Sequence, residues 1–128
     1  MASCICNCDT VKKNVLIYSC SGAANVAEIS DRVARRLTKE GAGAMFCLAG
    51  LGAELPNMVE TARKADFSLV LDGCPVDCAR KIVEKVKLAN ARVIRITDLG
   101  ITKAKGVPVT DEQVEKVYQE AKRILATA

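Results

Sequence analysis

The chain lacks histidine and tryptophan, and it has only two tyrosines and two phenylalanines among its 128 residues. Without histidine, the protein has neither the commonest general base nor the commonest nitrogen ligand for metals. A catalytic Ser-His or Cys-His pair is therefore excluded. The few aromatic rings do not make a stacking platform for single-stranded nucleic acid, so we expect no nucleic acid partner.

Long apolar runs are also missing. No stretch reaches the roughly 18 apolar residues that span a bilayer, so we expect no association with a membrane. Residues 1–13 carry cysteines and polar residues where a signal peptide has an apolar segment, which predicts a cytoplasmic location. The net charge of +4, from 19 basic and 15 acidic residues, is mild and typical of a solvated surface.

Half of the residues are hydrophobic, and many fall in short runs separated by stretches of helical periodicity. This alternation predicts a single-domain α/β fold of the Rossmann-like kind, with helices on both faces of an open parallel sheet. Right-handed crossovers favour the strand order 2-1-3-4. A short fifth strand at 107–109 would have to lie at the edge, because it contains proline. The runs that predict the four strands are Val15–Ser19, Ala44–Ala49, Phe67–Leu71 and Arg92–Thr97.

Helix starts are indicated by local capping signals. Asn25 with Glu28, and Thr110 with Gln113, have the spacing of capping boxes. Pro75 suits the first position of a helix that extends to about residue 88. We divide the chain into a cysteine-containing N-terminal tail, residues 1–12, and an α/β domain, residues 13–128.

The seven cysteines are the most informative feature. In a reducing cytoplasm, many cysteines indicate metal binding or redox chemistry rather than structural disulfides. Because the carboxyl ends of parallel strands meet at one edge of a sheet, cysteines at several strand ends are expected to form a cluster there. A cysteine taken alone is more often a small hydrophobic core residue, and this interpretation is strongest for Cys47. The four cysteines at predicted strand ends are Cys20, Cys47, Cys74 and Cys78.

Cys74 and Cys78 are expected on the first turn of one helix, with Cys74 at its N-cap. The positive end of the helix dipole stabilises a thiolate at such a position. Glycines flank the four cysteines and let backbone N–H groups approach the sulfur atoms. These glycines are Gly22, Gly50, Gly52 and Gly73.

Four segments together resemble the DGC-domain family, which is named for its Asp-Gly-Cys tripeptide. They are CSGAAN at 20–25, MFCLAG at 45–50, DGCPVDC at 72–78 and DLG at 98–100. The resemblance extends over residues 14–125 and implies a zinc-binding protein whose four cysteines act together. Those cysteines correspond to Cys20, Cys47, Cys74 and Cys78.

Two functions fit this constellation. The first is a thiolate metal site, with zinc as the favoured ion, in a sensing, carrier or metal-handling role rather than in catalysis. An iron–sulfur cluster uses the same number of ligands and is less favoured. The second is thiol redox chemistry or sulfur transfer, in which Cys74 attacks and Cys20 or Cys78 resolves.

Phosphoryl transfer is a third and weaker hypothesis. A cysteine that ends the first strand resembles the loop of small tyrosine phosphatases, but Val26 stands where those enzymes have arginine. The tail cysteines, Cys4, Cys6 and Cys8, form either a metal-binding arm or a set of exposed thiols. A protein partner, if there is one, is expected to contact them.

Overall fold

The computed structural model describes residues 13–128 and shows a single sheet. All neighbouring strands are parallel and their order is β2-β1-β3-β4, which confirms the predicted topology. Each strand is followed along the chain by a helix, as the sequence pattern predicts. The strands are β1 (Val15–Ser19), β2 (Ala44–Met45), β3 (Phe67–Asp72) and β4 (Ala91–Arg95).

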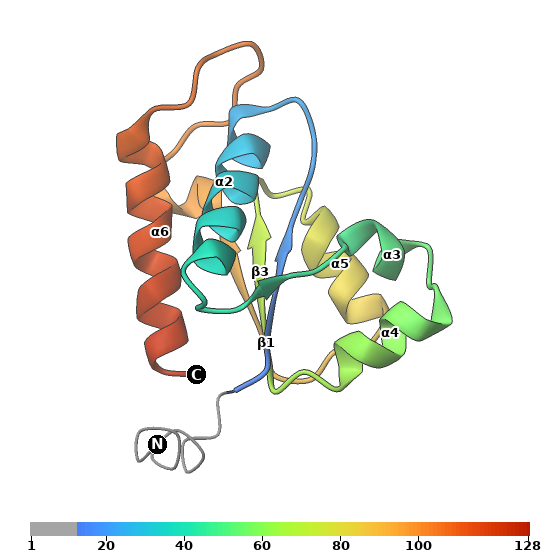
Figure 1. Ribbon diagram of the computed structural model, residues 1–128. Helices are drawn as coiled ribbons and strands as arrows, with labels where there is room; N and C mark the ends of the chain where they lie inside the picture. The colour runs from blue at the N-terminus through green and yellow to red at the C-terminus, as the bar shows by residue number, and fades with distance from the viewer. Residues whose placement is uncertain (1–12) are drawn as a thin grey trace, which may run out of the picture.

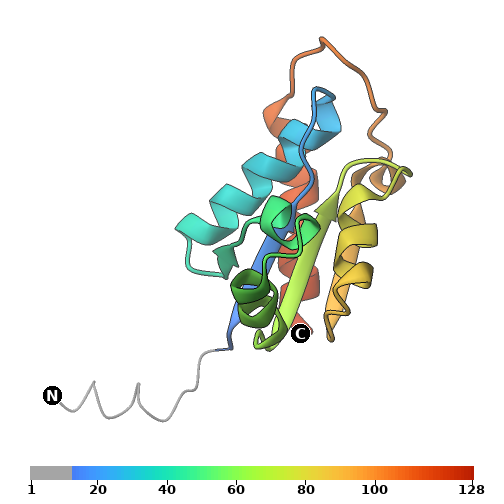
Figure 2. The ribbon, with the colours of Figure 1, turned by 90° about the vertical axis from the view of Figure 1, so that its right-hand side faces the viewer.

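The helices form a layer on each face of the sheet (Figures 1 and 2). Helices α2 and α6 cover one face, and α3, α4 and α5 cover the other. None of the helices in residues 13–128 is long and apolar enough to cross a membrane. Their bounds are α2 (Asn25–Lys39), α3 (Leu48–Gly52), α4 (Pro56–Arg63), α5 (Cys78–Lys85) and α6 (Asp111–Ala126), and a 3₁₀ helix, η1 (Ile96–Leu99), follows β4.

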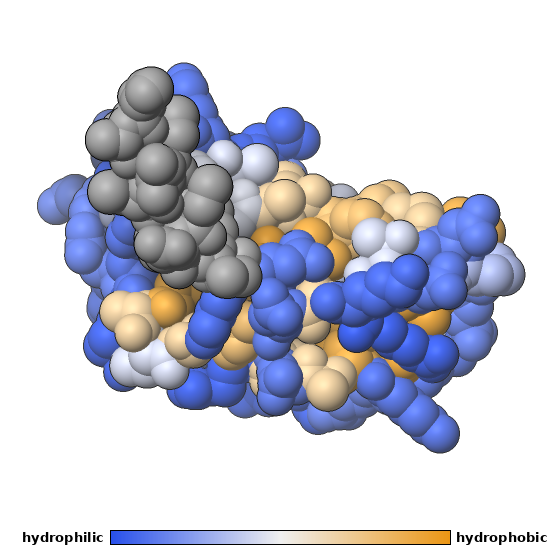
Figure 3. All heavy atoms as spheres, turned by 60° about the horizontal axis from the view of Figure 1, so that its bottom comes forward, coloured by the Kyte–Doolittle hydropathy of each residue, from blue (hydrophilic) through white to orange (hydrophobic). Residues whose placement is uncertain are grey.

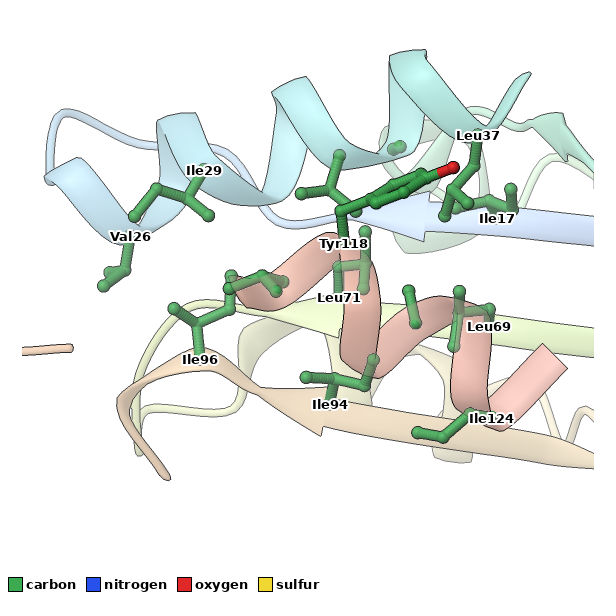
Figure 4. Packing of buried hydrophobic residues seen from close by; sticks show 14 of the residues in the cluster. Ile17, Val26, Ile29, Leu37, Leu69, Leu71, Ile94, Ile96, Tyr118 and Ile124 are labelled. Carbon is green, nitrogen blue, oxygen red and sulfur yellow. The ribbon is translucent and has the colours of Figure 1, made fainter. Parts of the chain in front are cut away.

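The two central strands, β1 and β3, are buried on both faces. Ile17 and Leu69 point toward α2 and α6, whereas Tyr18 and Val70 point toward the other helix layer. All four side chains are fully buried. Figure 4 shows the first of these layers, in which side chains of α2 and α6 meet those of the sheet. The continuous apolar runs in the sequence are thus explained by burial on both faces.

The two predicted capping boxes have different outcomes. The one at α6 is confirmed: the backbone N–H of Gln113 donates to Thr110 Oγ1, and the backbone N–H of Thr110 donates to Gln113 Oε1, both at 3.1 Å. The one at α2 is wrong, because the N-cap is Ala24 and Asn25 is the first helical residue. The side chain of Asn25 instead bonds to the segment that follows η1.

The helix predicted to begin at Pro75 begins three residues later. Cys74 to Asp77 form a turn closed by a 3.0 Å hydrogen bond from the backbone N–H of Asp77 to the carbonyl of Cys74. Proline suits the second position of such a turn as well as it suits a helix start. Asp77, in the left-handed conformation (φ 58°), is the N-cap of α5. Cys74 is therefore not a helix N-cap, whereas Cys78 is the first helical residue.

The edges of the sheet are shorter than the apolar runs predict. Strand β2 has two residues, and the chain turns into α3 after Cys47. The strand predicted at Ala44–Ala49 is therefore too long, because a short apolar run in the sequence does not distinguish a strand from a helix start. Strand β4 ends at Arg95, where η1 begins. Residues 107–109 form no strand in the described part of the chain.

Figure 3 turns the amino-terminal ends of β1 and β3 toward the viewer. Hydrophilic residues border a band of apolar residues on this end of the molecule. The loops that carry the described cysteines follow the other ends of the strands.

Candidate functional site

The structure places all four described cysteines just beyond the carboxyl ends of the strands. Cys20 directly follows β1, Cys47 is the N-cap of α3 after β2, and Cys74 lies two residues after β3. Cys78 opens α5. Cys47 and Cys78 are exposed, and Cys20 and Cys74 are partly buried.

Two neighbouring hollows on this edge share cysteines. A cavity of about 200 Å³, which we call the thiol cavity, is lined by Cys20, Cys74 and Cys78. A second hollow of about 390 Å³, the outer hollow, is lined by Cys20, Cys47 and Cys78. The two hollows are therefore adjacent, because Cys20 and Cys78 line both of them.

The thiols are neighbours but do not converge on one point. Within residues 13–128, no group of three or more cysteine, aspartate or glutamate side chains is arranged so as to hold a metal ion. Cys47 lines only the outer hollow and Cys74 lines only the thiol cavity. The roles predicted for the four cysteines as metal ligands thus stay a prediction. The tail cysteines lie outside the described residues.

Cys20 is held by its surroundings more firmly than the other cysteines. The backbone N–H of Gly73 donates to Cys20 Sγ at 3.2 Å, and the thiol lies 3.6 Å from Ser30 Oγ. Burial raises the pKa of the Cys20 thiol, although the hydrogen bonds with Ser30 and Gly73 act in the opposite direction. Cys20 is therefore harder to deprotonate than a thiol in water.

Gly73 is required by the close approach of the backbone to Cys20. A Cβ atom at this position would lie 2.8 Å from Val26 Cγ2 and 3.3 Å from Cys20 Sγ. The first distance is shorter than carbon atoms tolerate, so any larger residue would push α2 or the loop away. Glycine thus allows the N–H of residue 73 to reach the sulfur.

Asp72 places the start of α5 against the end of β3. Its side chain is 1% exposed, and its carboxylate accepts hydrogen bonds from the backbone N–H groups of Ala79 (3.3 Å) and Arg80 (2.9 Å). A carboxylate at a helix start is stabilised by the free N–H groups there. Because α5 is fixed in this way, Cys78 is positioned beside the strand that leads to Cys74.

Asp77 fixes the turn between Cys74 and Cys78. Its carboxylate accepts bonds from Arg95 at 2.7 and 2.9 Å and from Arg80 at 2.8 Å. The two guanidinium groups hold the pKa of Asp77 far below its usual range, with the Arg95 hydrogen bond as the largest cause. This cluster ties the cysteine turn to the end of β4, and sequence analysis missed it because no local pattern joins positions so far apart.

Lys103 is another residue that sequence analysis missed. Its Nζ lies 3.4 Å from Cys74 Sγ, and both Lys103 and Lys105 line the thiol cavity. The contact places a positive charge directly beside the Cys74 sulfur. A separation of 29 residues between the partners gives no signal in the sequence.

Cys47 makes a different contact. The backbone N–H of Gly50 donates to its sulfur at 3.3 Å, so the thiol caps α3. The side chain nevertheless stays exposed and faces the outer hollow. The interpretation of Cys47 as a buried core residue is therefore wrong, because the chain leaves the sheet before this position.

Comparison with known proteins agrees with these motifs. The profile of the DGC domain matches residues 16–121. The chain is 31% identical over 110 residues to the anaerobic and virulence modulator AnvM of Pseudomonas aeruginosa, which covers 86% of this chain and 84% of the relative. No solved structure matches the chain. With its Asp-Gly-Cys tripeptide at 72–74 inside the matched region, the chain belongs to the DGC-domain family.

Proposed function

We propose that the thiols on this edge of the sheet act together to bind a thiophilic metal ion, zinc, in a sensing, carrier or metal-handling role. The observation that carries the proposal is the sharing of Cys20 and Cys78 between the two hollows. It brings four soft ligands from three strand ends to one surface. A zinc ion with four thiolates is the usual tetrahedral arrangement, and an iron–sulfur cluster is the less favoured occupant of the same ligands.

The donor chemistry fits the ion, whereas the separation of the ligands argues against a structural role. The chain has no histidine, so sulfur is its only soft ligand. Since the four sulfurs do not converge, binding requires the turns that carry Cys47 and Cys74 to close on the ion. The free energy of that movement weakens binding relative to a preformed site. Weaker binding supports sensing or transport more than a structural role.

The name of the Pseudomonas relative describes it as a modulator. For the present chain this supports a sensing role more than a catalytic one. The packing of β1 and β3 on both faces supports the same choice, because the fold has a complete core without any ligand.

Cobalt(II) titration of the reduced full-length protein under anaerobic conditions tests the proposal. We expect a sulfur-to-cobalt charge-transfer band that zinc abolishes on addition. Cys74→Ser and Cys78→Ser should each weaken the band strongly, because each removes one thiolate ligand. The matched control replaces Cys4, Cys6 and Cys8 with serine and should keep the band.

The absence of a band in the wild-type protein would contradict the proposal. A band that survives in Cys74→Ser and Cys78→Ser but disappears with the tail cysteines would assign metal binding to the tail instead.

Thiol redox chemistry is the second candidate function, and the contact between Lys103 and Cys74 favours it. A lysine beside a cysteine is a common arrangement at reactive thiols, and Cys20 or Cys78 lines the same cavity as a resolving thiol. Treatment with one equivalent of a small disulfide should produce a Cys74–Cys78 or Cys74–Cys20 crosslink, identified by peptide mass spectrometry. If neither crosslink forms, this candidate is wrong.

A further inference from the structure

Two lysines at the thiol cavity have no part in metal binding. Lys103 and Lys105 both line the cavity. In residues 13–128 neither ammonium group lies within 4.0 Å of a carboxylate oxygen, whereas Lys85 pairs with Glu54 and arginines make nine further ion pairs. Positive charge beside a cavity, with no internal partner, is suited to an anionic ligand.

The segment that carries these lysines is fixed in place. The side chain of Asn25 donates to the carbonyl of Thr102 at 3.0 Å and accepts from the N–H of Ala104 at 2.7 Å. The backbone N–H of Asn25 also donates to the carbonyl of Ala104 at 2.9 Å. Asn25 is 5% exposed, and an antiparallel bridge joins Ala24 to Lys105. These hydrogen bonds and the bridge attach the segment that carries both lysines to the start of α2, beside the cavity.

Only one carboxylate opposes this charge among the described residues that line the cavity. It belongs to Asp72, whose oxygens accept hydrogen bonds from the backbone at the start of α5. The Asp72 carboxylate is therefore bound to the backbone N–H groups at the start of α5. Among the described residues, the cavity thus combines three thiols with two ammonium groups that have no carboxylate partner.

We propose that the thiol cavity binds a small disulfide that carries a carboxylate, with the anionic group beside Lys103 and Lys105 and the sulfur atoms beside Cys74. The proposal rests on the second candidate function, because it gives that thiol chemistry a class of substrate. A volume of about 200 Å³ suits a small compound, since drug-sized ligands occupy about 300–1,000 Å³.

The chemistry is thiol–disulfide exchange. The thiolate sulfur of Cys74 attacks one sulfur of the ligand, so that a Cys74–ligand bond forms and the S–S bond of the ligand breaks. The other half leaves as a thiolate and takes a proton from water. The thiolate of Cys20 or Cys78 then attacks Cys74 Sγ and releases the second half. The ligand is reduced to two thiols while two cysteines are oxidised to one disulfide.

A charge series of matched disulfides tests this proposal. The probes are 3,3′-dithiodipropionate (anionic), bis(2-hydroxyethyl) disulfide (neutral) and cystamine (cationic). Their arms have similar lengths and differ mainly in terminal charge. The rate at which each probe modifies Cys74 in the full-length protein is measured at low salt by peptide mass spectrometry, after rapid quenching.

We expect the anionic probe to react faster than the neutral one, and the neutral one faster than the cationic one. In Lys103→Met and in Lys105→Met the ratio of the anionic to the neutral rate should fall about fivefold, which corresponds to one charge pair at about 4 Å in water. The ratio is used because a change in the thiolate fraction of Cys74 alters both rates equally. Lys64→Met, on the exposed end of α4, has the same change in net charge and should leave the ratio unchanged.

Equal rates for the three probes would overturn the anion preference while leaving thiol chemistry at Cys74 intact. A fall in Lys64→Met as large as in Lys103→Met would overturn it too, because the effect would then come from net charge. If no probe modifies Cys74, the second candidate function fails together with this inference.

Discussion

The packed layers of the sheet and the thiol edge differ in side-chain burial and in backbone regularity. In the layers, side chains such as Ile17 and Leu69 are fully buried and lie on regular strands. At the edge, Cys47 and Cys78 are exposed, and Asp77 has a left-handed backbone conformation. Stability therefore comes from the layers, and the reactive groups lie on loops and at a helix start at the edge of a rigid scaffold.

The largest effect that this comparison predicts is on the free energy of unfolding. Leu69→Ala removes a fully buried side chain from β3 and should lower that free energy by about 2–5 kcal/mol. Cys78→Ser changes an exposed side chain and should lower it by less than about 0.5 kcal/mol. Urea unfolding of the metal-free, reduced proteins measures both. Similar losses in the two variants would show that the edge is part of the core.

Zinc should stabilise the protein without being needed for folding. A ligand of the native state adds about 3–4 kcal/mol at 100 to 1,000 times its Kd. Thermal melts should therefore shift upward with zinc in the wild type and much less in Cys74→Ser. Excess chelator should leave the α/β circular dichroism and a cooperative melt. Loss of secondary structure on chelation would mean that folding requires the ion, and it would refute a sensing role.

Gly73→Ala should destabilise the protein by about 1–3 kcal/mol, because the added Cβ meets Val26 Cγ2 at 2.8 Å. Addition of Val26→Ala removes the obstructing methyl groups, so the double variant should lose less than the sum of the single losses. Gly52→Ala is the control, since its Cβ would meet the flexible Ile82 side chain at 3.3 Å and should cost less. Strict additivity of the first pair would contradict the explanation of Gly73.

Asp77→Asn should be less stable than the wild type at neutral pH, because it loses the ion pairs with Arg80 and Arg95. Asparagine tolerates the left-handed conformation of residue 77, so the substitution isolates the charge. The pKa of Asp77 is lower in the folded protein than in the unfolded chain. Its contribution is thus complete above the unfolded value of about 3.9 and is lost as the pH falls toward the folded value.

Denaturant unfolding of wild type and Asp77→Asn across the acidic range checks this dependence. The difference between the two proteins should shrink as the pH decreases. A difference that stays constant from neutral to strongly acidic pH would mean that Asp77 acts through backbone conformation alone.

The sequence predicts the layers better than the edge, for a physical reason. Apolar runs such as Val15–Ser19 are determined by burial on both faces, which leaves a direct signature in composition. The strand order follows because right-handed crossovers leave few alternatives. The helix start predicted at Pro75 is wrong because proline is compatible with a turn as well as with a helix start. The hydrogen bond from the N–H of Asp77 to the carbonyl of Cys74 places Pro75 in a turn, and the ion pair of Asp77 with Arg95 joins that turn to β4.

The candidate site shows the same limit. The cysteines could be assigned to strand ends because strands are predictable. Their neighbours come from distant segments: Ser30 and Gly73 reach Cys20, and Lys103 reaches Cys74. Such contacts depend on how α2 and the loop after η1 pack, and a single sequence has no periodic signal for them.

Amide hydrogen exchange of the reduced protein, with and without zinc, tests most directly whether the thiols form one site on an independent core. We predict that zinc increases protection in the segments that carry the thiols, residues 20–22, 47–52 and 73–78, and leaves the strong protection of β1 and β3 unchanged. Either of two results would contradict this account: β1 and β3 lose their protection when zinc is removed, or zinc changes the exchange of none of the three segments.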